Sequence, residues 1–179
     1  MPESLSNPLL SGPFARVLIE LRWGDMDAYG HVNNVTQLKL LEEARVKAFG
    51  SPTAARDVIP GELPGGERTD AFGLVMPPVF REASADVQIL VSGHAIDYRD
   101  PIPYRDGPIA IDVCIVKITP VIIKVGYVIL EPDGSKVYSV AESDLVFVDG
   151  ETGRARRLRD DEQAAFADCA VGPLPLKRR

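Results

Sequence analysis

The chain has 179 residues, of which 45% are hydrophobic and 26% charged, and its formal net charge at pH 7 is −6. This length and balance predict one soluble globular domain with a core of its own. An acidic chain is not expected to have general affinity for nucleic acid or anionic membranes, which require a basic face. We therefore expect neither among its partners.

The N-terminal sequence and the cysteines indicate a cytoplasmic protein. Residues 1–13 have neither the basic start nor the continuous apolar run of a secretory signal, and no stretch reaches membrane-spanning length. Cys114 and Cys169 are too few for a disulfide framework and lie in no cluster with metal-ligand spacing. We expect a flexible N-terminal segment over 1–13, one domain over 14–169, a tail over 170–179, and no metal.

A strand followed by a long helix opens the predicted fold. Between Ala15 and Trp23 apolar and polar residues alternate, which is the period of a half-buried strand. From Asn34 to Phe49 apolar residues recur every three or four positions, starting with Val35 and Leu38. That period is typical of an amphipathic helix, and Gly50-Ser51-Pro52 supplies a stop signal.

The rest of the chain is predicted to be mostly β. A Pro- and Gly-rich loop over 60–73 precedes extended stretches around 72–81 and 85–91, and His94 is expected in a loop. Longer strands are expected over 109–118, 121–130 and 136–148, with Asp133-Gly134 as a hairpin turn, and a short helix over 160–169. One long helix with about five further extended segments predicts an α+β fold in which an antiparallel sheet covers the helix.

The junction between the first strand and the helix reads Asp25-Met26-Asp27-Ala28-Tyr29-Gly30-His31-Val32-Asn33-Asn34. Two carboxylates precede a turn, and the last residues open the helix. The free N–H groups of a helix's first turn, with the positive end of its dipole, stabilise developing negative charge. A carboxylate beside them can act as a general base or a nucleophile. The sequence therefore predicts a reaction site at this junction.

This junction, with Leu41-Glu42-Glu43-Ala44-Arg45 after it, resembles the signature of the 4-hydroxybenzoyl-CoA thioesterase family of hotdog-fold acyl-CoA thioesterases. The resemblance covers residues 14–166. Outside the motif it extends only to the order of the predicted helices and strands. It implies a single hotdog domain, with an antiparallel sheet wrapped around a long central helix. It also implies hydrolysis of an acyl-CoA to free acid and CoA without a cofactor. Hotdog proteins pair their sheets edge to edge, so a homodimer or homotetramer is expected.

The resemblance assigns roles within the junction. Asp27 takes the position of the catalytic carboxylate, as general base or nucleophile, and the Asn34 amide that of the oxyanion donor. An ordinary turn aspartate is the alternative for Asp27, although the attached Gly-His-Val-Asn-Asn favours catalysis. Asp25 is a weaker candidate that could instead cap or brace the turn. His31 is expected to orient the turn or a water, because the Asn-Pro of hotdog dehydratases is missing before it.

Further candidates lie outside the turn. Glu42, a little over two turns beyond Asn34, is a second candidate acid, with a charged outer helix face as the alternative. The candidate substrate-binding residues are Asn33, Arg99 and Lys117, the last two for CoA phosphates or as ordinary surface charges. At Gln37 the chain departs from the family, many members of which carry Tyr there.

Two other functions remain compatible with the sequence. One is hydrolysis of an acyl carrier protein thioester, which the acidic chain slightly disfavours because an acidic carrier helix prefers a basic surface. The other is a hotdog module without catalysis that binds an acyl thioester or only dimerises.

Overall fold

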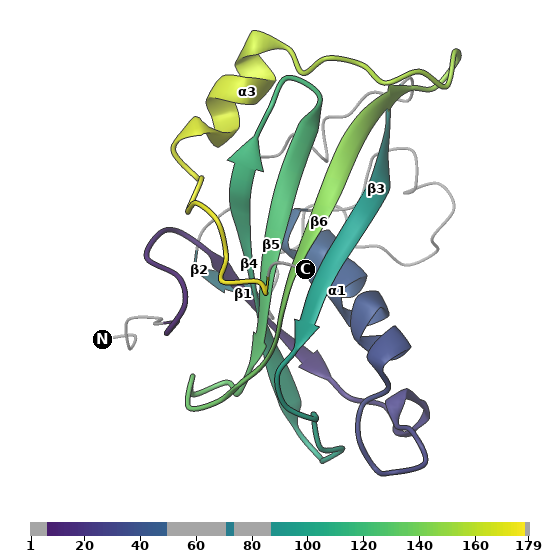
Figure 1. Cartoon of the computed structure of the whole chain (residues 1–179), viewed down its shortest axis with the longest axis vertical. Helices are drawn as coiled ribbons and strands as arrows, with labels where there is room; N and C mark the ends of the chain where they lie inside the picture. Colours follow the sequence, from purple (N-terminus) through teal and green to yellow (C-terminus); the bar gives the residue numbers. More distant parts are fainter. Residues whose placement is uncertain (1–6, 50–70, 74–86, 178–179) are drawn as a thin grey trace.

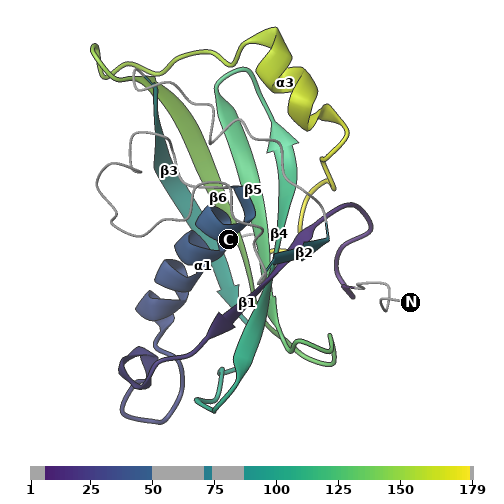
Figure 2. The same cartoon turned by 180° about the vertical axis from the view of Figure 1, so that it is seen from behind.

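A computed structural model describes residues 7–49, 71–73 and 87–177. One antiparallel sheet carries a long helix on one face (Figures 1 and 2), and its strand order is β2-β1-β4-β5-β6-β3. The strands are β1 (Ala15–Glu20), β2 (Ala71–Gly73), β3 (Val87–Tyr98), β4 (Pro108–Ile118), β5 (Ile122–Leu130) and β6 (Val137–Asp149). A 3₁₀ turn, η1 (Trp23–Asp25), and two helices, α1 (Asn34–Phe49) and α3 (Asp160–Ala167), complete the described elements. This arrangement confirms the α+β fold with a long helix on an antiparallel sheet.

Helix α1 has the bounds that the apolar period predicts, but its first turn is oriented differently. The buried residues are Gln37, Leu40, Leu41, Ala44 and Phe49, which follow the three-to-four spacing of one helix face. Val35, expected to start the buried stripe, is 61% exposed. The buried face of α1 therefore begins at Gln37.

Alternate residues of the sheet face opposite sides, and both sides are covered. In β4, Ile109 and Ile111 belong to the core that includes α1, whereas Ala110 and Cys114 face away from it. The antiparallel register pairs Ala15 of β1 with Val113 of β4, so the same alternation continues across the strands.

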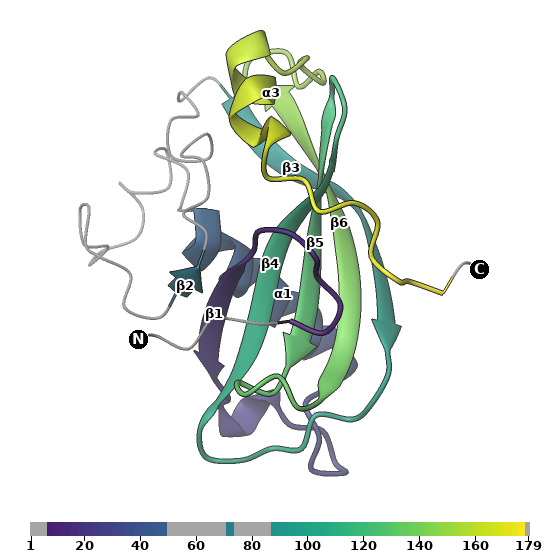
Figure 3. The ribbon, with the colours of Figure 1, turned by 90° about the vertical axis from the view of Figure 1, so that its left-hand side faces the viewer.

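The chain's own terminal segments cover the sheet face opposite α1 (Figure 3). Leu9 and Leu10 from one segment and Leu174 from the other pack on this face. A Cβ at Gly126 would lie 2.7 Å from Leu174 Cδ1 and 2.6 Å from Val116 Cγ2, so the close approach of the C-terminal segment requires glycine there. Residues 7–13 and 170–177, expected as a flexible segment and a tail, thus contribute to a second, smaller core.

A buried ion pair joins β1 to β4 on the same face. The Arg16 guanidinium donates to both carboxylate oxygens of Asp112, with Nε–Oδ1 and Nη2–Oδ2 distances of 2.7 Å. Asn7 Nδ2 donates to Asp112 Oδ2 at 2.6 Å, and Arg16 Nη1 donates to the Pro132 carbonyl at 3.0 Å. Burial raises the pKa of Asp112, against the opposing effect of Arg16. The pair therefore ties the N-terminal segment to the sheet.

Three expectations about the strands need correction. The first strand ends at Glu20, before Trp23, because Asp25 Oδ2 accepts the Arg22 N–H at 2.7 Å and bends the chain into η1. Part of the expected 60–73 loop is strand β2. His94 lies in β3 and not in a loop, because that strand continues to Tyr98. The expected extended residues 74–81 and 85–86 lie outside the described residues.

Candidate active site

The chain between η1 and α1 folds into a tight turn around Asp27. The Asp27 N–H donates to the His31 carbonyl at 2.7 Å, and the Gly30 N–H donates to the Asp27 carbonyl at 3.2 Å. Gly30 adopts a φ of +78°, a conformation that glycine takes without steric cost. Asp27 Oδ1 also accepts the N–H groups of Tyr29, at 2.8 Å, and of His31, at 3.1 Å. The turn thus holds the carboxyl group in one place.

These hydrogen bonds set the charge of Asp27. The His31 N–H, and after it the Tyr29 N–H, lower the pKa of the Asp27 carboxyl below its usual value. Oδ1 receives both bonds, and Oδ2 has no hydrogen-bond partner among the described residues. At neutral pH the group is therefore a carboxylate with one oxygen available to accept a proton or to attack a carbon.

Asp25 stabilises the same turn through two hydrogen bonds. Its side chain accepts the Arg22 N–H, and its backbone carbonyl accepts the Asn33 N–H at 2.9 Å. The residue is buried. These contacts join the end of η1 to the start of α1, which is the bracing role considered as its alternative.

The first turn of α1 leaves amide groups without a partner among the described residues, and that of Asn34 is the first of them. Asn33 Oδ1 accepts the Val35 N–H at 2.8 Å and so caps the helix, while the Asn33 carbonyl accepts the Gln37 N–H at 3.0 Å. The Asn34 N–H has no hydrogen-bond partner among the residues the structure describes. Tyr98 Oη donates to the Asn34 carbonyl at 3.1 Å, which ties this residue to β3. A free amide at the positive end of the helix dipole is suited to bind a developing oxyanion.

An open pocket of about 340 Å³ lies at this end of α1. Four of the sequence-predicted residues line it: Asp27, His31, Asn34 and Arg99. The structure adds Val32, Gln37, Tyr98, Asp100 and Pro101. The carboxylate and the free amide therefore share one solvent-accessible space.

The other candidates lie elsewhere. The Glu42 side chain is 68% exposed on α1, and its carboxylate lies 3.6 Å from the Arg45 guanidinium. Lys117 is exposed near the end of β4 remote from Pro108. Neither lines the pocket at the start of α1. Arg99 does, and its Nη2 also donates to the Pro175 carbonyl at 2.8 Å.

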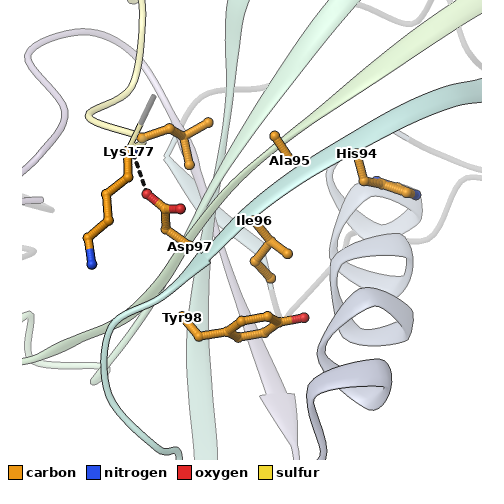
Figure 4. A pocket seen from close by; sticks show the side chains of 7 residues that line it. His94, Ala95, Ile96, Asp97, Tyr98 and Lys177 are labelled. Atoms are coloured by element: carbon orange, nitrogen blue, oxygen red, sulfur yellow. Dashed lines mark hydrogen bonds between the residues drawn. The ribbon is translucent and has the colours of Figure 1, made fainter. Parts of the chain in front are cut away.

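Tyr98 is a site residue that the sequence analysis missed. Its strand appeared to end at Val91 because an extra residue between Val91 and Gly93 interrupts the period-two pattern as a bulge. The residues after the bulge, 93–98, show no clear alternation, so no local signal marked the rest of the strand. Figure 4 shows the result: along β3 the Tyr98 ring points toward α1, whereas Asp97 lies beside Lys177. Tyr98 lines both the pocket at the helix start and a second hollow of about 490 Å³ along β3.

The described part of the chain contains neither a metal-binding cluster nor a membrane-spanning helix. No group of three or more His, Cys, Asp or Glu side chains within 7–49, 71–73 and 87–177 could hold a metal ion. In the same part of the chain, no helix is long and apolar enough to cross a membrane.

The sequence matches the family model of the thioesterase-like superfamily over residues 21–166. No curated protein matches it significantly. Its fold is similar to that of the probable thioesterase YbaW from Escherichia coli, with a TM-score of 0.63 and 22% identity over 87% of this chain and 98% of that one. It is also similar to DHNA-CoA thioesterase from Staphylococcus aureus, with a TM-score of 0.62 and 15% identity over 86% of this chain and 89% of that one. At these identities the structures bear on the fold, which is the hotdog arrangement implied by the motif.

Proposed function

Because the chain belongs to the thioesterase-like superfamily, we propose that it is an acyl-CoA thioesterase that releases a free acid and CoA. One observation carries this proposal: Asp27, with one carboxylate oxygen unbonded, and Asn34, whose N–H has no partner among the described residues, line the same open pocket. Thioester hydrolysis requires a polarised carbonyl and an attacking oxygen, and these two groups can provide both.

In the proposed reaction the thioester carbonyl oxygen accepts a hydrogen bond from the Asn34 N–H. With Asp27 as general base, Oδ2 takes a proton from water as the water oxygen bonds to the carbonyl carbon. The C–S bond then breaks, and the CoA sulfur leaves and takes up a proton. With Asp27 as nucleophile, Oδ2 bonds to the carbonyl carbon, the C–S bond breaks, and the CoA sulfur leaves as a thiolate that takes up a proton. Water then hydrolyses the resulting anhydride, which releases the acid and restores the Asp27 carboxylate. Both routes use the oxygen that the turn leaves free.

The other residues around the pocket have supporting roles in this proposal. His31 orients the turn through its backbone and places its ring beside a bound water. Asn33, which is not among the lining residues, holds the helix start by capping it. Arg99 lies at the pocket and suits a CoA phosphate. Glu42 and Lys117, outside this pocket, take no part in the proposed step.

We further propose that the substrate is a small molecule, that no nucleic acid or membrane is bound, and that the reaction is cytoplasmic. Both cysteines are free thiols, as a reducing compartment would keep them. Burial raises the pKa of the Cys114 thiol to about 12, so it is not a competing nucleophile.

The experiment that tests the function is thiol release from a panel of acyl-CoAs with short, long, branched and aromatic acyl groups. We expect turnover of at least one class by the intact protein. Activity with acyl carrier protein thioesters and none with any acyl-CoA would replace the proposed substrate. Binding of acyl-CoA without turnover would instead support a module without catalysis.

We propose that the assembly is a homodimer, or a tetramer built from such dimers, joined along β3. This strand is last in the strand order, and Leu90 and Val91 on it are 48% and 38% exposed. Pairing two such edges would satisfy their backbone groups and cover these side chains.

Replacing Leu90 by lysine is therefore expected to shift the protein to monomer, because a charged edge strand opposes pairing. Light scattering after size-exclusion chromatography measures the mass. Val35→Lys, a matched change of an exposed aliphatic residue on α1, is the control and should keep the wild-type mass. A wild type that is monomeric at micromolar concentration would contradict the proposal.

A further inference from the structure

Gln37 is a buried polar side chain at the site to which the motif assigns no role. It lies one turn beyond Asn34 on α1, lines the pocket at the helix start, and is 4% exposed. The other described polar residues that line this pocket are half-buried or exposed. Gln37 is thus the buried polar residue in the lining of a pocket that is otherwise open to solvent.

The sheet sets the orientation of the Gln37 amide. The Ser139 hydroxyl on β6, fully buried, donates to Gln37 Oε1 at 2.7 Å. Nε2 has no hydrogen-bond partner among the described residues. The hydrogen bond from Ser139 holds Oε1 toward the sheet. The NH₂ group is on the other side of the same planar amide and therefore points away from Ser139. The reversed amide would place a second acceptor oxygen in the pocket of the Asp27 carboxylate, which is electrostatically unfavourable.

Helix geometry brings this NH₂ group toward the free Asn34 amide. Side chains on a helix lean toward its N-terminus, so Gln37 covers the turn that contains Asn34. Nε2 is not among the described side-chain atoms that are fully buried without a partner, so it remains available to an acceptor in the pocket. An acceptor oxygen supplied by the substrate at this place would take its hydrogen bond.

We propose that Gln37 Nε2 donates a second hydrogen bond to the thioester carbonyl oxygen, beside that of the Asn34 N–H, and that Ser139 is the positioning residue that aims it. This inference rests on the proposed thioesterase function. Donors fixed in place before the reaction stabilise the oxyanion without reorganisation, and a desolvated donor is more effective than one in water.

The test compares Gln37→Met with wild type on the best acyl-CoA of the panel. Methionine has a similar length but no donor, so kcat is expected to fall about 100-fold, the usual effect of losing one oxyanion donor. KM should rise by no more than about tenfold, because the bond to the carbonyl is already made in the ground state and strengthens in the transition state. Lys39→Met, the same substitution at an exposed position of α1, is the control and should keep wild-type kcat. A kcat for Gln37→Met within about threefold of wild type would overturn the inference.

Ser139 provides a second, independent readout. Ser139→Ala frees the amide to rotate, so it should lower kcat by less than Gln37→Met does. Added to Gln37→Met it should lower kcat no further, since Ser139 acts only through Gln37. Additive losses, accompanied by a parallel fall in thermal stability, would show a structural role and overturn the inference. If Gln37→Met does not fold, Gln37→Glu replaces it, because its carboxylate still accepts from Ser139.

Binding of two unreactive analogues separates this inference from the proposed function. One analogue is the acyl-CoA ketone with CH₂ in place of sulfur, which keeps the carbonyl; the other is the S-alkyl thioether, which lacks it. Gln37→Met should bind the ketone about tenfold more weakly and the thioether equally well, since one hydrogen bond is lost only with the former. Equal loss with both would overturn the inference. Wild type that binds both but hydrolyses nothing would refute the thioesterase and leave the Gln37 contact testable.

Discussion

Replacing Asp27 by asparagine is expected to lower kcat/KM for thioester hydrolysis by about 10²–10⁴-fold while the protein stays folded. The fold should survive because Asn Oδ1 can still accept the N–H groups of Tyr29 and His31, which hold the turn. What is lost is the charge and basicity of the oxygen that those bonds leave free. Thiol release, with circular dichroism and thermal unfolding on the same samples, measures both parts of the prediction.

Asp100→Asn is the matched control, because Asp100 also lines this pocket but lies 3.4 Å from the Lys136 ammonium. It should keep most of the activity. Equal losses for the two variants would mean that the pocket requires negative charge in general and not a base at Asp27.

The pH dependence of kcat/KM checks the same carboxylate. The pKa of Asp27 is lowered by the backbone N–H groups of His31 and Tyr29, so the reactive, ionised form persists as pH falls. The rate should therefore decline only below about pH 3.9, the ordinary value for Asp. An acid limb well above this pH would contradict Asp27 as the group whose ionisation controls the rate.

The second large effect expected is on stability: Asp112→Ala should lower the free energy of unfolding by about 3–5 kcal/mol. The substitution leaves the Arg16 guanidinium, 5% exposed, without its carboxylate, and it also removes the acceptor of Asn7. Urea unfolding followed by circular dichroism measures the difference.

Two further variants show whether burial causes this effect. Asp161→Ala removes a comparable Arg159–Asp161 contact of 3.2 Å whose side chains are 62% and 72% exposed, and it should cost less than about 1 kcal/mol. The double replacement Arg16→Met with Asp112→Leu should recover much of the loss, since no uncompensated charge remains. An Asp112→Ala cost no larger than that of Asp161→Ala would contradict the buried-pair account.

Much of this fold could be predicted from the sequence because it follows local periodicity. Helix α1 begins at Asn34 and ends at Phe49 as expected, because its spacing and its stop signal are written in neighbouring residues. Strands β4, β5 and β6 and the hairpin at Asp133-Gly134 agree to within one residue for the same reason. The turn motif also identified the residues of the pocket that come from the junction, namely Asp27, His31 and Asn34.

Other features depend on contacts between distant segments. The end of β1 at Glu20 depends on a side chain that bonds back to the backbone, and the length of β3 depends on a bulge that only pairing with β6 can accommodate. The packing of the terminal segments over the second face of the sheet depends on the absence of a side chain at Gly126.

The sequence by itself determined helix α1, strands β4 to β6, the family and the carboxylate-turn-helix junction, because each is specified by residues within a few positions of one another. Only the tertiary structure decided what surrounds that junction. Tyr98 reaches it from β3, and Ser139 from β6 holds the Gln37 amide across 102 positions of sequence. Such contacts depend on which strands lie next to which and in what register, and no local period carries that information.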